Sequence, residues 1–145
     1  MMDTDEKFMR EALKEAQLAA SEDEVPIGAV VVSRGRIIAK GYNMTERLND
    51  PTAHAEMIAT TAACEAIGGK YLNDCSLYVT VEPCPMCAAA LGWAQLGRLV
   101  YGAADPKRGC SLFHPCLLHP KTETASGILA EDCSELLSGY FKSKR

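Results

Sequence analysis

Three side chains suited to binding a metal ion lie in two short segments of this sequence. His54 belongs to the segment His-Ala-Glu, and Cys84 and Cys87 belong to the segment Pro-Cys-Pro-Met-Cys. Imidazole nitrogen and thiolate sulfur are common zinc ligands, and a catalytic zinc site usually has three protein ligands and one open position. We therefore predict a catalytic zinc site formed by His54, Cys84 and Cys87.

The last residue of the first segment, Glu56, provides a carboxylate beside this predicted site. Zinc acidifies a bound water molecule, and a nearby carboxylate can take the proton and pass it to a ring nitrogen or a departing amine. Zinc proteases also combine zinc with a glutamate, but they follow the pattern His-Glu-x-x-His, which is absent from this sequence. The residue types indicate hydrolytic deamination, with Glu56 as the catalytic proton carrier.

Both segments are predicted to lie at the starts of helices. Cys84 and Cys87 are three positions apart, a spacing that places two side chains on the same face of a helix. Each segment follows an acidic residue and a proline, Asp50-Pro51 and Glu82-Pro83, and these residue types favour helix starts. The partial positive charge of a helix N-terminus also favours thiolate over thiol.

Other interpretations of these ligand-type residues exist. Cys84 and Cys87 could form a redox-active pair or a structural zinc knuckle, but His54 and Glu56 upstream favour the catalytic site. Four further residues of ligand type lie close together in the sequence: Cys110, His114, Cys116 and His119. Their spacing fits no common zinc pattern, so we expect a loop or a short helix there.

Apolar spacing along the chain predicts alternating strands and helices. The predicted helices cover residues 4–20, 52–67, 84–96 and 130–141, and the predicted strands cover 27–32, 36–42, 77–81, 98–102 and 122–127. The first two strands form a predicted hairpin, and the helix between the third and fourth strands predicts a parallel pair. Because the strands are almost entirely apolar, we expect helices on both faces of the sheet. Trp93 and Leu96 are predicted core residues.

The composition indicates one domain. A chain of 145 residues has the size of a single domain. It has no apolar run long enough to span a membrane and no basic segment followed by an apolar one at its amino end, as spans and signal peptides require. Its seven cysteines are an odd number at irregular spacing, which is typical of reduced thiols. We expect one cytoplasmic domain over residues 1–145, without a membrane partner.

The charge distribution leaves the question of a nucleic-acid partner open. A net charge of −4 disfavours such a partner, because phosphate neutralisation by basic residues dominates affinity for nucleic acids. The last predicted helix nevertheless ends in Lys142, Lys144 and Arg145. These residues could contact RNA, or they could be a solvated helix end whose dipole favours cations.

The two segments resemble the zinc-dependent cytidine deaminase superfamily, whose signature combines His-x-Glu with Pro-Cys-x-x-Cys. Within that superfamily, the chain most resembles the bacterial tRNA-specific adenosine deaminases, over almost its whole length. The resembling stretches are residues 25–30, 49–56, 77–84 and 127–133. Between Asp105 and Gly127 the chain is several residues shorter than many members, and it lacks an asparagine-histidine pair that they often carry there.

The resemblance implies a three-layer α/β/α cytidine-deaminase-like fold with a mixed five-stranded sheet, a homodimer and one Zn²⁺ per subunit. It also implies hydrolytic deamination of adenosine to inosine at the wobble position of a tRNA anticodon loop. Asn43 matches an asparagine that hydrogen-bonds the flipped nucleoside, and Ala55 supplies a backbone contact to the base. Asp105 and Lys107 match residues on the anticodon-loop side, and Phe141 matches a terminal helix that lies along the RNA.

Two other functions compete with this expectation. Deaminases of free purines, particularly guanine, share the Cys-Pro-Met-Cys form and a tryptophan shortly after it. The stretch 25–28 and the basic end of the last helix favour the tRNA substrate instead. A catalytically silent RNA-binding module that keeps zinc for folding is the second competitor, and the intact Glu56 counts against it.

Overall fold

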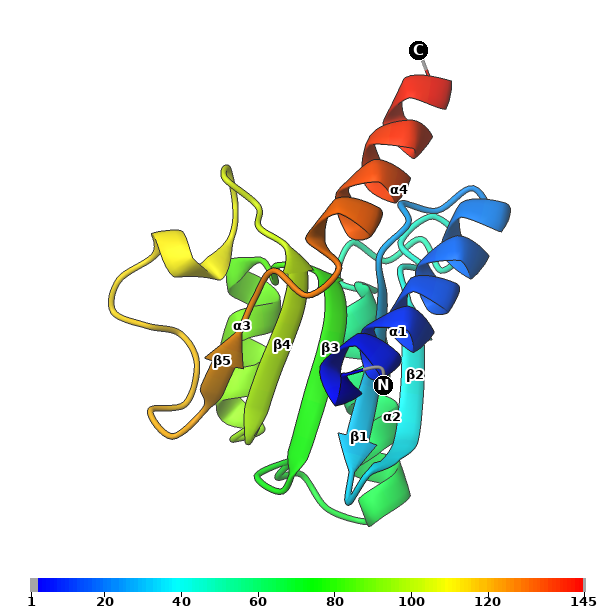
Figure 1. The fold of residues 1–145 in the computed structure, drawn as a ribbon. Coiled ribbons are helices and arrows are strands. Elements are labelled where there is room, and N and C mark those ends of the chain that lie inside the picture. Colours follow the sequence, from blue (N-terminus) through cyan, green and yellow to red (C-terminus); the bar gives the residue numbers. More distant parts are fainter. Residues whose placement is uncertain (1–2, 145) are drawn as a thin grey trace.

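Residues 3–144, which the computed structural model describes, form four α-helices and five strands (Figure 1). The helices are α1 (Thr4–Ser21), α2 (Ala55–Ile67), α3 (Pro85–Trp93) and α4 (Ala130–Ser143). The strands are β1 (Gly28–Ser33), β2 (Arg36–Tyr42), β3 (Cys75–Val81), β4 (Arg98–Ala103) and β5 (Glu123–Ala125). A 3₁₀ turn, η1 (Cys110–Leu112), lies between β4 and β5. The predicted order of elements is confirmed.

The strands form one mixed sheet in the order β2-β1-β3-β4-β5. β1 is antiparallel to both β2 and β3, which confirms the predicted hairpin. β3 and β4 are parallel, as the helix between them predicts, and β5 is parallel to β4. The mixed five-stranded sheet implied by the resemblance is therefore present.

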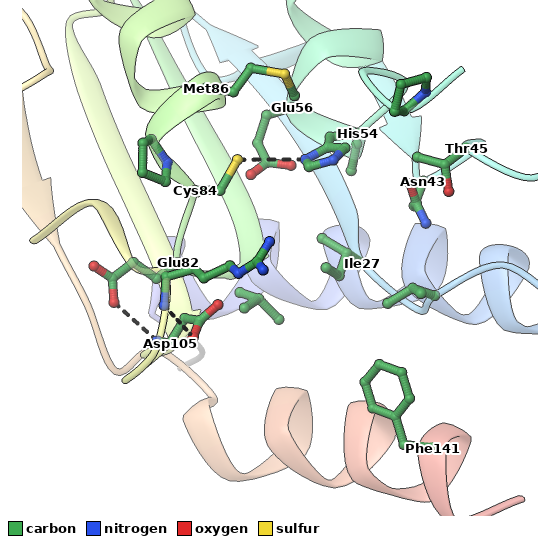
Figure 2. A pocket seen from close by; sticks show the side chains of 16 residues that line it. Ile27, Asn43, Thr45, His54, Glu56, Glu82, Cys84, Met86, Asp105 and Phe141 are labelled. Carbon is green, nitrogen blue, oxygen red and sulfur yellow. Dashed lines mark hydrogen bonds between the residues drawn. The ribbon is translucent and has the colours of Figure 1, made fainter. Parts of the chain in front are cut away.

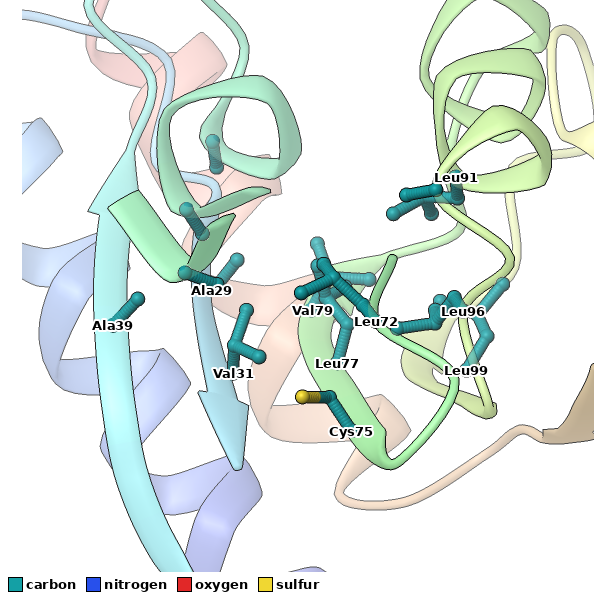
Figure 3. Close-up of a cluster of buried hydrophobic side chains, with 14 residues drawn as sticks. Ala29, Val31, Ala39, Leu72, Cys75, Leu77, Val79, Leu91, Leu96 and Leu99 are labelled. Carbon is teal, nitrogen blue, oxygen red and sulfur yellow. The ribbon is translucent and has the colours of Figure 1, made fainter. Parts of the chain in front are cut away.

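Helices cover both faces of this sheet (Figure 1). Side chains alternate between the faces along a strand, so Val31 packs in a buried cluster with residues of α2 and α3, whereas Val30 packs with residues of α1 and α4. Figure 3 shows the first cluster, to which Leu77 and Leu99 contribute from neighbouring strands. The three-layer α/β/α arrangement is confirmed.

Small residues bring α2 close to β2. Ala55 and Ala59 are completely buried, and their spacing of four places them on the same helix face. Opposite them, a Cβ atom on Gly41 would lie 2.8 Å from the carbonyl oxygen of Ala55, so this contact requires glycine. The close packing fixes the amino end of α2, where His54 and Glu56 lie.

Two helices are shorter than the sequence predicts. α2 begins at Ala55, with His54 as its N-cap residue. α3 ends at Trp93, because Gln95 adopts a positive φ of 54° and turns the chain. Leu96 then enters the core with an exposed fraction of 1%, whereas Trp93 is 84% exposed. The prediction that Trp93 is a core residue is wrong, because it lies on the outer side of the last helical turn.

The cysteines are unpaired, as predicted. All seven are free thiols. Four of them are buried: Cys75, Cys87, Cys110 and Cys133. Among residues 3–144, no helix has the length and apolar character needed to cross a bilayer.

Candidate active site

The three predicted ligand residues converge at the amino ends of α2 and α3; Figure 2 shows His54 and Cys84. His54 is the N-cap residue of α2, Cys84 is the N-cap residue of α3, and Cys87 lies in the first turn of α3. The Nδ1 atom of His54 is 3.7 Å from Sγ of Cys84 and 3.5 Å from Sγ of Cys87. Pro85, not Pro83, occupies the first position of α3.

These distances fit a zinc ion. Tetrahedral coordination with Zn–N of about 2.1 Å and Zn–S of about 2.3 Å separates nitrogen and sulfur ligands by about 3.6 Å. The two observed separations of 3.7 and 3.5 Å are close to that value. Within residues 3–144 this is the one group of three or more ligand-type residues close enough to hold a metal ion. Cys110, His114, Cys116 and His119 are not part of this group.

The local electrostatics favour a thiolate at Cys84. Hydrogen bonds from Cys87 and then from His54 lower the pKa of Cys84 to about 4, more than burial raises it. The same contact with Cys84, together with burial, raises the pKa of Cys87. The hydrogen bond with Cys84 also raises the pKa of His54. The lowered pKa of Cys84 favours the thiolate, which is the form of cysteine that binds metal ions.

Glu56 lies beside this group in the first turn of α2. Its side chain is almost completely buried, and Figure 2 shows its carboxyl group near His54 and Cys84. Burial raises the pKa of Glu56 to about 7, although hydrogen bonding and the charge of His54 act in the opposite direction. A carboxyl group with a pKa near neutral pH can both accept and return a proton during catalysis.

A pocket of about 660 Å³ opens over this group, a volume within the range of small-molecule sites. Besides His54, Glu56 and Cys84, it is lined by four of the five predicted substrate-binding residues: Asn43, Ala55, Asp105 and Phe141. They come from separate parts of the chain, namely the end of β2, the start of α2, the loop after β4, and α4. Figure 2 shows Phe141 projecting from α4 on the side of the pocket opposite the ligand group.

Sequence matches identify the family to which this site belongs. Residues 2–103 match the model of the cytidine and deoxycytidylate deaminase zinc-binding region. The tRNA-specific adenosine deaminase of Bacillus subtilis strain 168 is 44% identical, over 99% of this chain and 92% of its own length. The chain belongs to the tRNA-specific adenosine deaminase family. The deaminase is also 48% identical to the protein of that name from Rickettsia bellii, over 94% of this chain and 99% of that protein.

The fold of the deaminase is similar to those of two solved deaminase structures. One comes from biochemical and structural studies of A-to-I editing by tRNA:A34 deaminases at the wobble position of transfer RNA. It is 47% identical with a TM-score of 0.85, over 90% of this chain and 99% of that chain. The guanine deaminase of Bacillus subtilis is 42% identical with a TM-score of 0.65, over 68% of this chain and 64% of that chain.

Several pocket residues of the deaminase were not selected from the sequence, and Arg108 is the clearest example. The backbone N–H groups of Lys107 and Arg108 donate to Oδ1 of Asp105 at 2.9 and 3.0 Å. This turn places Arg108 against the pocket, while Lys107 is exposed outside the lining. Two adjacent basic residues after an Asp-Pro turn are a recognisable signal, but the sequence does not show which of the two faces the pocket.

Proposed function

We propose that this deaminase hydrolyses adenosine to inosine at the wobble position of a tRNA anticodon, with zinc held by His54, Cys84 and Cys87. The observation that carries the proposal is the buried Glu56 carboxyl group beside these three ligand atoms, at the base of one pocket. The names of the relatives support the same reaction and the same class of RNA. The family model of a zinc-binding region supports the metal, and the single group of three ligand-type residues within residues 3–144 supports one zinc ion per subunit.

Zinc, Glu56 and the apolar pocket lining have separate roles in this reaction. Bound zinc supplies the Lewis acidity that makes a water molecule nucleophilic near neutral pH. Glu56 takes one proton from the attacking water and gives it to the ring nitrogen. It then takes the second proton from the oxygen that has been added to the ring carbon and gives it to the amine, which departs as ammonia. Its pKa of about 7 makes both directions of transfer accessible. Ile27 and Val81 give part of the pocket an apolar lining, against which a purine ring can pack.

The pocket walls suit a nucleotide that is already unstacked. The Asn43 amide, buried at the edge of the pocket, offers both a donor and an acceptor to the nucleoside. Ala55 lines the pocket, and in this proposal its backbone contacts the base. Phe141, which is 47% exposed on α4, provides a ring on which a flanking base can stack. In this proposal the anticodon loop contacts Asp105 in the pocket lining and the exposed Lys107 outside it. Loop nucleotides need little energy to leave the stack.

We also propose that the deaminase acts as a homodimer in the cytoplasm, with residues 1–145 as one catalytic domain. The exposed ring of Trp93 supports the dimer, because aromatic residues are enriched at protein interfaces. Free thiols throughout the chain support a reducing compartment. The two buried clusters share one sheet, which supports a single domain.

The proposal is tested with the zinc-loaded protein and an anticodon stem-loop that carries a wobble adenosine. Free guanine, adenosine and cytidine are incubated in parallel, and inosine and ammonia are measured. Inosine in the stem-loop alone is the expected result. A stem-loop without its wobble adenosine is the control for ammonia from other bases.

Guanine deamination is the second candidate, because the deaminase is 42% identical to the guanine deaminase of Bacillus subtilis over part of both chains. Release of ammonia from free guanine, with an unchanged stem-loop, would replace the tRNA substrate by a free purine. The roles of His54, Glu56, Cys84 and Cys87 would stay the same in that case, since both reactions add water to a purine carbon.

A further inference from the structure

Glu82 is a buried carboxylate that the reaction described above does not use. It follows β3 directly and is only 4% exposed. Its position two residues before Cys84 indicates a charge that favours a helix start, but α3 begins only at Pro85. The structure shows a different set of partners, on the loop that follows β4.

The two carboxylate oxygens of Glu82 bind two separated points of that loop. Oε1 accepts a hydrogen bond from the backbone N–H of Asp105 at 3.0 Å, and Oε2 accepts one from the backbone N–H of Ser111 at 2.9 Å. Figure 2 shows the contact between Glu82 and Asp105. Hydrogen bonds to a buried charged acceptor are stronger than those between neutral groups, so this side chain holds both ends of the loop.

Gly109 allows the loop to lie directly on this carboxylate. A Cβ atom on Gly109 would overlap the carboxyl group of Glu82. The φ angle of Gly109 is −63°, which any residue can adopt. Glycine is therefore required here because a larger residue would collide with the Glu82 carboxyl group, and not because of the backbone conformation.

The backbone around Glu82 adds two further connections. The N–H of Glu82 donates to the carbonyl of Ala103 at 2.8 Å, and the N–H of Cys110 donates to the carbonyl of Pro83 at 2.9 Å. The segment directly before Cys84 is thus joined to both ends of the 104–111 loop. That loop carries Asp105 and Arg108, which line the pocket, so its position relative to the ligand group depends on these contacts.

We propose that Glu82 is a positioning residue that holds the 104–111 loop, with Asp105 and Arg108, in the place where the RNA substrate contacts it. Glu82 also lines the pocket, but both of its oxygens accept backbone N–H groups of the loop, and Glu82 is assigned no step in the proposed reaction. The inference deepens the proposed function and rests on it, because the benefit of a fixed loop lies in its contacts with RNA around the target nucleotide.

Two substitutions disturb this contact from opposite sides. Glu82→Gln keeps the shape but replaces one acceptor oxygen by an amide group that cannot accept a hydrogen bond. Gly109→Ala leaves Glu82 intact and places a methyl group against it. Glu65→Gln removes an exposed carboxylate, and Gly69→Ala adds a methyl group where nothing lies within 4 Å, so these two are the matched controls.

Steady-state kinetics on the stem-loop separate positioning from chemistry. Because the loop contacts bound RNA rather than the reacting atoms, both test variants should raise KM about tenfold and change kcat by less than about threefold. Their zinc content should equal that of the wild type. Loss of zinc, or a lower kcat at unchanged KM, would show that Glu82 supports the metal-binding segment instead, and would overturn the proposal.

Amide hydrogen exchange provides a readout that does not depend on the substrate. Exchange at the N–H groups of Asp105 and Ser111 should become faster in Glu82→Gln and in Gly109→Ala, and should stay at the wild-type rate in both controls. Unchanged exchange in Glu82→Gln would also overturn the proposal. If the wild type does not deaminate the stem-loop, the proposed function fails, while the attachment of the loop by Glu82 is still decided by this measurement.

Discussion

The Nδ1 atom of His54 lies 3.5 Å from Sγ of Cys87, although 33 residues separate them in the sequence. His54 precedes α2, and Cys87 lies in the first turn of α3. Both helices pack on the same face of the sheet and share one buried cluster. The distances between the three ligand atoms therefore depend on how α2 and α3 pack against the sheet.

Replacement of Cys87 by Ala should abolish stable zinc binding and activity together, because two protein ligands seldom hold zinc against competing chelators. The metal content of the purified protein, determined by mass spectrometry, checks this. Cys116→Ala is the control, since Cys116 is exposed and outside the ligand group. A Cys87→Ala variant that kept one zinc per chain would exclude Cys87 as a ligand.

Glu56→Gln should lower kcat on the stem-loop by about a hundredfold to ten-thousandfold, because the amide cannot carry the proton. The zinc content should stay at the wild-type level, since Glu56 is outside the three-ligand group. Single-turnover measurement of inosine formation checks the loss. Full activity in this variant would mean that the proton follows another route.

The ion pair between Asp5 and Arg98 should make the folded protein less stable at acidic pH. Arg98 donates to both carboxylate oxygens of Asp5, at 2.7 and 2.8 Å, and joins α1 to β4. Tyr78 donates to the same carboxylate at 2.7 Å. The Arg98 hydrogen bonds are the main reason that the pKa of Asp5 lies below its usual value of 3.8. Asp5→Asn should lower the free energy of unfolding at pH 7 by about 2 kcal/mol.

The sign of the pH effect follows from the lowered pKa. The unfolded chain binds the Asp5 proton more readily than the folded protein does, so acid favours unfolding. The stabilisation is complete above the unfolded pKa near 3.8 and is lost as the pH falls through the lower folded value. Urea denaturation should show a constant difference between wild type and Asp5→Asn from pH 7 to about pH 5, shrinking only below pH 4. A difference that shrinks between pH 7 and pH 5 would contradict this.

Arg108→Ala should weaken binding of the stem-loop and reduce the salt dependence of binding by about one unit in the slope of log K against log salt. The reason is the loss of one cation that faces the pocket. Fluorescence anisotropy over a range of salt concentrations measures both effects. Arg36→Ala removes an exposed arginine at the start of β2 as a control. Equal slopes for the two variants would show that Arg108 does not contact phosphate.

Trp93→Ala should shift the proposed dimer towards monomer, because 84% of this residue is exposed in the single chain and large aromatic residues often dominate interface energies. Sedimentation velocity at several protein concentrations measures the shift. Leu18→Ala is the control, because it shortens an exposed apolar side chain on a different helix, α1. If both variants sediment like the wild type, Trp93 is not at the interface.

The chemistry of the site was predictable because it is encoded locally. His54 and Glu56, together with Cys84 and Cys87, define a ligand set and a proton carrier by residue type and short spacing. Trp93 was not predictable in the same way. An apolar residue on a helix with apolar neighbours favours a core position, and only the turn at residue 95 shows that the helix ends with this side chain directed outward.

The sequence by itself determined the order of strands and helices, the candidate ligands and the reaction class, because periodicity and residue type act over a few neighbouring positions. Only the tertiary structure decided that Glu56 is buried, that Arg108 rather than Lys107 lines the pocket, and that Glu82 binds the 104–111 loop. Each of these depends on contacts between segments far apart in the chain, which local patterns do not specify.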